Sequence, residues 1–320
     1  MARIYEWMTI HKWMTDYTPQ TEWIERRGLM VWIAEVFTSL GSGLYLISLF
    51  FSMNPDANIK WLSWWGLLLG WLIIMFLKIP IHLAYFGKPW RFWRTIPPFS
   101  NGWKTSWFAR GIIFSMLFGG FAFLQLVSSF LILQNIVTWD FLPALDILFK
   151  VLGGITALLT GIYPGFIMNY VKGIQFWNSA LLPVILVIGG VLYGCALLVA
   201  VALFGGNNTL VNVAEELSRV LLILNIFLIA VYLWSATYVG AAAKVSVMQL
   251  IRGKIVISAT FWIGVVILGM LIPLAISLFG ASSILLIVAI ITHIIGAFAL
   301  KYCILKVGIY KPLFTVNVCP

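Results

Sequence analysis

The chain has 320 residues, of which 62% are hydrophobic and only 9% are charged, and its mean hydropathy is +1.03. An ordinary soluble domain has about a quarter of its residues charged, so this composition excludes one and indicates an integral membrane protein. The formal net charge of +10 would suggest a nucleic-acid partner for a soluble protein. In a membrane protein the excess of Lys and Arg is expected in the loops, so we predict contact with the lipid bilayer and none with nucleic acid.

Residues 1–28 mix charged residues with tryptophans and have neither a short apolar core nor a small-residue cleavage site. We therefore expect no cleaved signal peptide here. We predict that this part of the chain is an N-terminal interfacial segment, with Trp7, Trp13 and Trp23 in the headgroup layer of the membrane.

Eight apolar runs follow, and each is long enough to cross about 30 Å of hydrocarbon as a helix. The runs are Leu29–Phe51, Trp61–Leu83, Phe108–Leu133, Leu148–Met168, Ser179–Phe204, Leu217–Val239, Ile255–Leu278 and Ser282–Leu305. The strands of a membrane β-barrel would instead alternate apolar and polar residues. We therefore predict an all-α, polytopic integral membrane protein, with eight transmembrane helices in a bundle over residues 29–305 and a C-terminal tail over residues 306–320.

An even number of crossings places both termini on one side of the membrane, which we call side A. Sixteen Lys and Arg residues belong to side A, whereas the opposite side, side B, has only Lys60, Lys150 and Arg219. The positive-inside rule predicts that side A is cytoplasmic and that the protein lies in the cell (inner, cytoplasmic) membrane. An alternative is that the side-A cations are docking residues for an acidic partner.

Four polar residues of the apolar runs lie near side A. Glu35 is six residues into the first run, roughly 9 Å from its end at 1.5 Å per residue. Lys78 and Tyr163 each lie five residues before the side-A ends of their runs, so the three share nearly one depth. His82 follows Lys78 on the same helix face by the i,i+4 rule.

Ionisable side chains inside hydrocarbon are costly unless they are paired or hydrated, so we predict that these four line one polar pocket open to side A. A desolvated carboxylate beside a tyrosine hydroxyl suits a carrier whose oxygens gain or lose protons as electrons move. The structural alternative is an ion pair between Glu35 and Lys78, with Tyr163 hydrogen-bonded to the backbone.

His293 stands alone near the middle of the last run, and His11 lies outside the runs. A bis-histidine haem needs two axial histidines at one depth, and His82 near side A does not match His293. Cys195, Cys303 and Cys319 show no metal-binding spacing. We therefore expect no haem and no metal in this chain.

The stretch 84–110, which comprises the loop between the second and third runs and the start of the third, concentrates five cations among Trp and Phe side chains. These are Lys88, Arg91, Arg94, Lys104 and Arg110. Their simplest interpretation is an interfacial belt with cations that extend to the headgroups. A loop of about 24 residues is nevertheless long for a compact bundle, so we predict that it is a docking platform for a partner subunit.

Four stretches of the chain are similar, in order, to the signatures of one known family. FTSLGSGLYLIS is similar to its Gly-rich first helix, and FGKPWRFW followed by TSWFARG is similar to D-L-G-R-P-x-R-F and T-S-W-x-x-R-G. YPGFIMNYVKGIQFWNSALLP is similar to Y-x-G-F with W-N-x-x-L-L-P, and KYCILKVGIYKPL is similar to an R-Y-x-x-L-x-x-G-x-Y ending. Over nearly its whole length the chain resembles the NrfD/polysulfide reductase membrane-anchor (PsrC-like) family.

The resemblance implies an anchor subunit without haem that binds a quinone, menaquinone or ubiquinone. It would exchange electrons between the membrane quinone pool and a ferredoxin-like iron–sulfur subunit, which is connected to a molybdopterin or other catalytic subunit. The terminal substrate then belongs to another chain. The resemblance also implies a quinone site in the first half of the chain, beside the docking face, with Tyr163 at the matching tyrosine.

Combining this resemblance with the polar pocket, we predict that Tyr163 and either His82 or Lys78 bind the quinone oxygens. Glu35 then relays protons toward side A. The acidic residue that the family has before L-G-R-P is Tyr85 in this chain, and the Arg of its last helix is Lys301. A proton role of that acid does not carry over, although Glu35 or His82 can take its place.

A second hypothesis is a secondary transporter or ion-translocating subunit. It would use Glu35, Lys78, Lys244 and His293. Transporters commonly show repeated halves with broken helices in matching positions, and the sequence shows no clear repeat. This favours the redox anchor. Proton movement can accompany its redox reaction.

Overall fold

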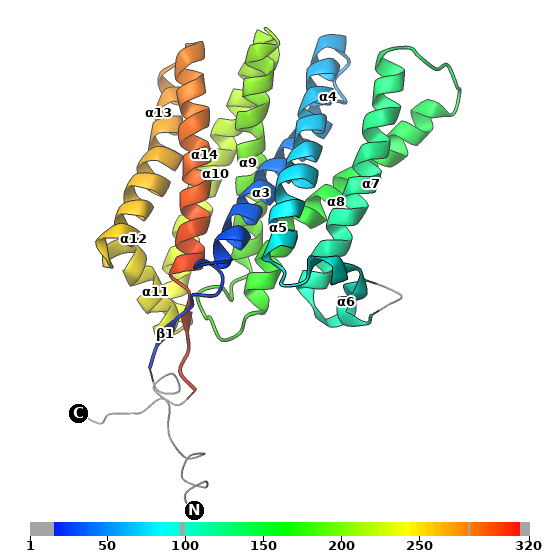
Figure 1. Ribbon diagram of the computed structural model, residues 1–320. Helices are drawn as coiled ribbons and strands as arrows, with labels where there is room; N and C mark the ends of the chain where they lie inside the picture. The colour runs from blue at the N-terminus through cyan, green and yellow to red at the C-terminus, as the bar shows by residue number, and fades with distance from the viewer. Residues whose placement is uncertain (1–15, 97–99, 281, 314–320) are drawn as a thin grey trace, which may run out of the picture.

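The computed structural model describes residues 16–96, 100–280 and 282–313. Within these ranges, eight helices are long and apolar enough to cross a membrane, and Figure 1 shows them side by side in one bundle. The spans are Gly28–Phe51, Ala57–Tyr85, Trp107–Leu133, Leu142–Tyr170, Leu181–Phe204, Asn208–Val239, Ile255–Phe279 and Ser283–Lys306. The predicted all-α membrane fold with eight crossings is confirmed.

Six of the spans are single continuous helices. They are α3 (Gly28–Phe51), α7 (Trp107–Leu133), α8 (Leu142–Tyr170), α9 (Leu181–Phe204), the long α10 (Asn208–Val239) and α14 (Ser283–Lys306). Short helices lie between the spans at side A, namely η2 (Pro89–Thr95), α6 (Gly102–Thr105) and α11 (Ala241–Arg252).

The second and seventh spans are interrupted. The second consists of α4 (Ala57–Leu72), the π-helical segment η1 (Ile73–Lys78) and α5 (Ile79–Tyr85). The seventh consists of α12 (Ile255–Ala259), the π-helical segment η3 (Thr260–Leu271) and α13 (Ile272–Phe279). Each π segment ends just before a proline, Pro80 or Pro273, whose ring and missing N–H disturb the i to i−4 ladder.

Three helices begin earlier on side B than the apolar runs predicted, and the first of them, α4, begins at Ala57 instead of Trp61. α8 begins at Leu142 instead of Leu148, and its first turns contain Asp146, which forms an ion pair with Lys150 at 2.8 Å. α10 begins at Asn208 instead of Leu217, because the Asn207 side chain accepts a hydrogen bond from the amide of Leu210 at 2.8 Å. Charges that we assigned to side-B loops therefore belong to helix ends.

α3 is the central helix of the bundle, since 78% of its apolar stretch is buried inside the protein. It packs closely against α9 through glycines on both helices. A Cβ atom added at Gly43 would lie 1.8 Å from the carbonyl oxygen of Gly190, and one added at Gly194 would lie 2.2 Å from the carbonyl carbon of Gly43. This backbone contact places the side-A half of α3, with Glu35, deep among its neighbours.

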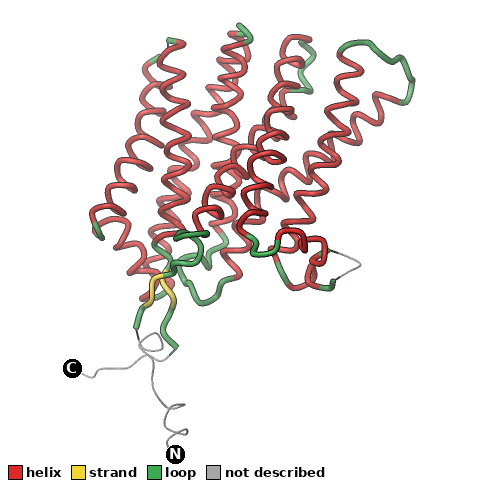
Figure 2. The backbone as a smooth tube through the Cα atoms, viewed as in Figure 1, coloured by secondary structure: helices red, strands yellow, loops and turns green. Residues whose placement is uncertain are grey.

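The described ends of the chain meet at side A. Strand β1 (Thr18–Pro19) pairs antiparallel with strand β2 (Ile309–Tyr310), as Figure 2 shows in yellow. The side-chain Nε2 atom of Gln20 donates a hydrogen bond to the carbonyl oxygen of Leu305. Residues 309–310 of the predicted C-terminal tail are thus a paired strand.

Trp23, which we assigned to the headgroup layer, packs on the buried Trp177 with ring centroids 5.3 Å apart. The predictions for Trp7, Trp13, His11 and Cys319 lie outside the described residues.

Candidate functional site

A pocket of about 120 Å³ lies at the side-A end of the bundle, between α3, α5, α7 and α8. It is lined by Trp23, Val31, Glu35, His82, Tyr85, Phe108, Tyr163, Pro164 and Ile167. The structure therefore brings together three of the four polar residues that we expected to share a pocket. The fourth, Lys78, does not line it.

Glu35 lies on α3 and is only 5% exposed. Its Oε2 atom is buried and has no hydrogen-bond partner among the described residues. The ammonium group of Lys301 lies beside it on α14, where Nζ donates to the backbone carbonyl of Glu35 at 2.5 Å and to the Ser39 hydroxyl at 2.6 Å. We had counted Lys301 as a helix-end cation of side A, but it is buried and it is the cation next to Glu35.

Lys78 is buried behind the pocket wall. Its Nζ atom donates a hydrogen bond to the Ser115 hydroxyl at 2.5 Å and lies 5.1 Å from the centre of the Tyr163 ring. Ser115 in turn donates to the carbonyl of Gly111 at 2.8 Å. The described residues therefore do not form the ion pair between Glu35 and Lys78 that we considered. Lys78 points toward α7 and α8 instead.

Tyr163 lies on α8 and is 3% exposed. Its ring fits against Gly111 of α7, where an added Cβ atom would lie 2.4 Å from two ring carbons. The hydroxyl group interacts with Thr38 and Glu35 of α3. The close approach of α7 to α8 at Gly111 thus decides where the Tyr163 hydroxyl lies in the pocket.

His82 reaches the pocket from α5, after the π-helical segment η1 has ended at Lys78. Its ring stacks on Phe108, with centroids 5.1 Å apart and planes inclined by 26°. The Nδ1 atom is buried and has no hydrogen-bond partner in the described part of the chain. A buried nitrogen without a partner can be satisfied by water or by a ligand in the pocket.

The pocket combines an apolar slot with a few polar groups. Trp23, Phe108 and Ile167 supply flat or aliphatic walls, while Glu35 and His82 present polar atoms without partners among the described residues. Such a site suits a small planar ring with hydrogen-bonding oxygens. The sequence analysis did not assign Trp23, Tyr85 or Phe108 to the pocket, although Tyr85 and Phe108 belong to motif stretches that it singled out.

The predicted docking cations fall into two groups. Lys88, Arg91, Arg94 and Lys104 are exposed at side A, on and around η2 and α6. Arg110 is only half exposed and holds the loop together: its Nε atom donates to the carbonyl of Trp103 at 2.8 Å and its Nη2 atom to that of Lys104 at 2.5 Å. Arg110 is therefore a structural residue of the loop, and the four others form its exposed basic surface.

The residues of the transporter hypothesis do not share one site. Lys244 is exposed on α11, and His293 is buried on α14 beside Tyr193, with ring centroids 5.3 Å apart. Neither lines the pocket of Glu35. No group of three or more His, Cys, Asp or Glu side chains suited to a metal occurs among the described residues.

The comparisons with known proteins agree with the motifs. The family model described as "Polysulphide reductase, NrfD" matches residues 27–312. The chain is 29% identical over 231 residues to "Protein NrfD" of Escherichia coli strain K12, covering 65% of this chain and 67% of that protein. It is 22% identical over 280 residues to "Protein NrfD homolog" of Haemophilus influenzae, covering 78% of this chain and 83% of that protein. The matched family region contains every pocket residue except Trp23.

Proposed function

Since the chain belongs to the polysulphide reductase NrfD family, we propose that it is the quinone-binding membrane anchor of a redox complex. In this proposal it binds menaquinone or ubiquinone and exchanges electrons between that quinone and a ferredoxin-like iron–sulfur subunit. A molybdopterin or other catalytic subunit of the complex acts on the terminal substrate.

The observation that supports this proposal most directly is the side-A pocket. Quinone chemistry needs an apolar slot, a hydrogen-bond partner for each ring oxygen and a proton route to water. The pocket offers aromatic walls, the Tyr163 hydroxyl, Nδ1 of His82 and Oε2 of Glu35, and the last two have no hydrogen-bond partner among the described residues. All of these lie at the end of the bundle nearest to the exposed basic loop.

We assign the roles by position. Tyr163 and His82 come from different helices that line the pocket, so they can contact the two oxygens of one ring. Glu35 lies beside Tyr163 and takes or returns protons on the side-A face of the pocket. Lys78 acts through Tyr163, because its ammonium group lies over the tyrosine ring and not in the pocket.

The exposed basic surface supports an acidic partner at side A. The loop between His82 and Phe108 contains four exposed cations, Lys88, Arg91, Arg94 and Lys104. Complementary charge would steer an acidic iron–sulfur subunit to this face and place its cluster near the pocket. Affinity that falls with increasing salt is expected for such docking.

The site is tested by replacing Tyr163 with Phe and Glu35 with Gln. Tyr163→Phe deletes one hydroxyl, so the assembled complex should remain while quinone turnover falls by about tenfold or more. Glu35→Gln keeps hydrogen bonding but removes titration, so turnover should fall and its pH profile should change. The assay is quinol-analogue oxidation or reduction by the whole complex, normalised to the amount assembled.

Tyr232→Phe is the matched control, because Tyr232 is also buried but lies on α10, in the other half of the bundle, and does not line this pocket. If both pocket variants keep wild-type turnover and wild-type affinity for a quinone-analogue inhibitor, then Tyr163 and Glu35 have only a structural role. Co-purification separates this proposal from the transporter hypothesis, since only the redox anchor requires an iron–sulfur partner.

A further inference from the structure

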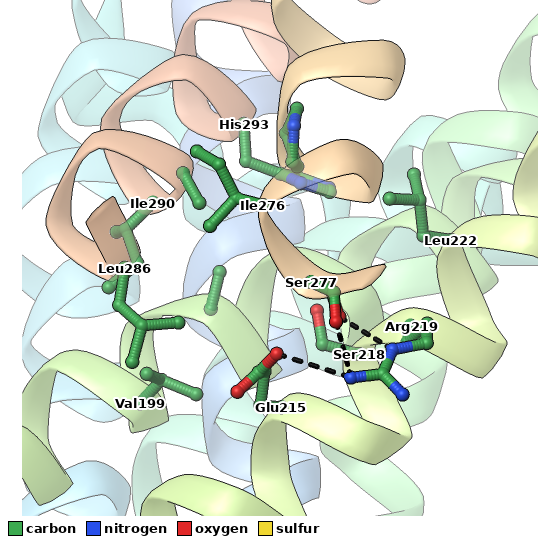
Figure 3. Close-up of a pocket in the computed structure, with 13 residues that line it drawn as sticks. Val199, Glu215, Ser218, Arg219, Leu222, Ile276, Ser277, Leu286, Ile290 and His293 are labelled. Atoms are coloured by element: carbon green, nitrogen blue, oxygen red, sulfur yellow. Dashed lines mark hydrogen bonds and ion pairs between the residues drawn. The ribbon is translucent and has the colours of Figure 1, made fainter. Parts of the chain in front are cut away.

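The half of the bundle that is remote from the quinone pocket contains a second, narrow crevice of about 40 Å³. It lies between α9, α10, α13 and α14 and is lined by Ala196, Val199, Glu215, Ser218, Arg219, Leu222, Pro273, Ile276, Ser277, Leu286, Ala289, Ile290 and His293. Figure 3 shows His293 at one end of this crevice and the group of Glu215, Arg219 and Ser277 at the other. None of these residues lines the quinone pocket.

Among the described residues, one polar residue at the inner end of the crevice, His293, and one that does not line it, Asn225, have side-chain atoms without partners. His293 is 3% exposed, and its Nε2 atom has no hydrogen-bond partner in the described ranges. Asn225 of α10 is 2% exposed, and its Oδ1 atom is likewise unpartnered there. Both lie near Tyr193: its ring is 5.3 Å from that of His293. Its hydroxyl and the side-chain nitrogen of Asn225 both approach Gly189, 3.6 and 3.7 Å from where a Cβ atom added there would lie.

The outer end of the crevice is charged and lies at side B, where α10 begins and α13 ends. Arg219 donates from Nε to the Ser277 hydroxyl at 2.7 Å and from Nη2 to the Ser277 carbonyl at 2.6 Å. The same Nη2 atom lies 3.4 Å from Glu215. Glu215 and Arg219 are the charged residues of the crevice lining, and His293 is its other titratable group.

Between the two ends the lining is apolar and partly of small residues, including Ala196 and Ala289. A buried polar atom that lacks a hydrogen bond costs roughly 1–3 kcal/mol, which a water molecule in reach of it recovers. One such atom, Nε2 of His293, belongs to a residue of the crevice lining, and the partly exposed Glu215 and Arg219 lie at the outer end. Water that enters past Glu215 can therefore reach the Nε2 atom of His293.

We propose that the second half of the bundle holds a proton-binding site, His293, which exchanges protons with side B through this crevice when it is filled with water. A proton from crevice water binds a ring nitrogen of the neutral imidazole and leaves by the same route, and Glu215 is the carboxylate nearest along that route. Tyr193 and Asn225 orient the imidazole and the innermost water. The site is independent of the quinone pocket, which lies at side A on other helices.

The test uses the full-length chain in lipid nanodiscs with ¹⁵N-labelled histidine. The chain has three histidines, and His293→Gln identifies the signal of His293 by its loss. The ring ¹⁵N signals of His293 should move with bulk pH, and its N–H should exchange with solvent.

Ala289→Leu should fill the crevice and slow this exchange by about tenfold or more, which corresponds to an added barrier of about 1.4 kcal/mol. Val288→Leu is the matched control, because Val288 is the neighbouring residue of α14, is 40% exposed and does not line the crevice.

A His293 signal that is unchanged over the whole pH range of the folded protein and does not exchange would overturn the proposal. Equal exchange rates in Ala289→Leu and in the wild type would also do so, because the crevice would then not be the route. Neither measurement depends on quinone or on a partner subunit, so the outcome is separate from that of the proposed function.

Discussion

At the scale of single residues, the candidate site depends on which side chains were left without partners. Lys78 and Lys301 are both buried, yet each is satisfied by oxygens outside the pocket. Glu35 and His82 each have one atom at the pocket that lacks a partner in the part of the chain that the structure describes. A buried polar group that is unpaired is costly, so a protein keeps one where a ligand or water uses it.

Gly111 is the residue that lets Tyr163 reach its position. Gly111→Ala would put a Cβ atom 2.4 Å from the tyrosine ring, and the ring would have to move. We expect the bundle to assemble with a displaced Tyr163 hydroxyl and with weaker binding of a quinone-analogue inhibitor, by about tenfold if one hydrogen bond of about 1.4 kcal/mol is lost. Inhibitor titration of the whole complex measures this.

Gly120→Ala, on the same helix, is the control for helix propensity, because nothing lies within 4 Å of a Cβ atom there. The interpretation fails if the two variants bind the inhibitor equally well.

At the scale of elements, the ends and interruptions of helices decide where polar residues point. The π-helical segment η1 ends at Lys78, and regular α-helix resumes before His82. Lys78 and His82 thus keep their i,i+4 spacing. The widened π-helical turn sets the direction in which both side chains point. Sites of function often lie at such π-helical interruptions.

The N-terminus of α10 offers a measurement of one cap. Asn207→Ala removes the side-chain oxygen that accepts from the Leu210 amide at 2.8 Å. A lost cap of this kind costs about 1 kcal/mol of stability, so thermal unfolding of the purified protein should occur at a lower temperature. Asn208→Ala, at the exposed first residue of the helix, should have a smaller effect. Equal unfolding temperatures for the two variants would show that the cap contributes nothing.

The segment before α3 is held to the end of α14 by Glu25 and Lys306, whose side chains are 2.5 Å apart. The hydrogen bond from Lys306 and its positive charge hold the pKa of the Glu25 carboxyl below its usual range. A carboxyl with a lowered pKa stabilises the folded contact above its unfolded pKa, and this contribution is lost as the pH falls through the folded value.

Amide hydrogen exchange of residues 20–25, corrected for its intrinsic pH dependence, should therefore increase at acidic pH in the wild-type protein. In Glu25→Gln this additional increase should be absent. The ion pair has no role in holding the segment if both proteins respond to pH alike.

At the scale of the whole molecule, two polar sites lie at opposite ends of the bundle and in different halves. The pocket that we propose for the quinone is reached from side A between α3, α5, α7 and α8. The crevice of His293 is reached from side B between α9, α10, α13 and α14. The backbone contact of α3 with α9 through Gly43, Gly190 and Gly194 joins the two halves.

The orientation of the whole molecule in the membrane is a prediction from charge, and it is testable with single cysteines. Lys104→Cys lies at side A and Asp140→Cys at side B, and both positions are exposed. With the natural cysteines replaced, a membrane-impermeant thiol reagent added to intact cells should label position 140 only. Labelling of position 104 alone would show that side A faces outward and that its cations serve docking.

The eight crossings were predictable from the sequence because the length and hydrophobicity of a run are local properties that lipid imposes on each helix separately. The shared depth of Glu35 and Tyr163 was predictable for the same reason, since helix rise alone converts position into depth. Family membership was predictable from motifs that keep their order along the chain.

Only the tertiary structure decided which neighbour each polar residue meets. Lys78 and Lys301 lie at similar depths on different helices, and the packing of the bundle brings Lys301 to Glu35 and Lys78 to Tyr163. Trp23 joined the pocket because β1 and β2 tie the start of the chain to its end. Rotation of a helix about its axis and contact between distant segments depend on the fit of many side chains at once, so no local pattern determines them.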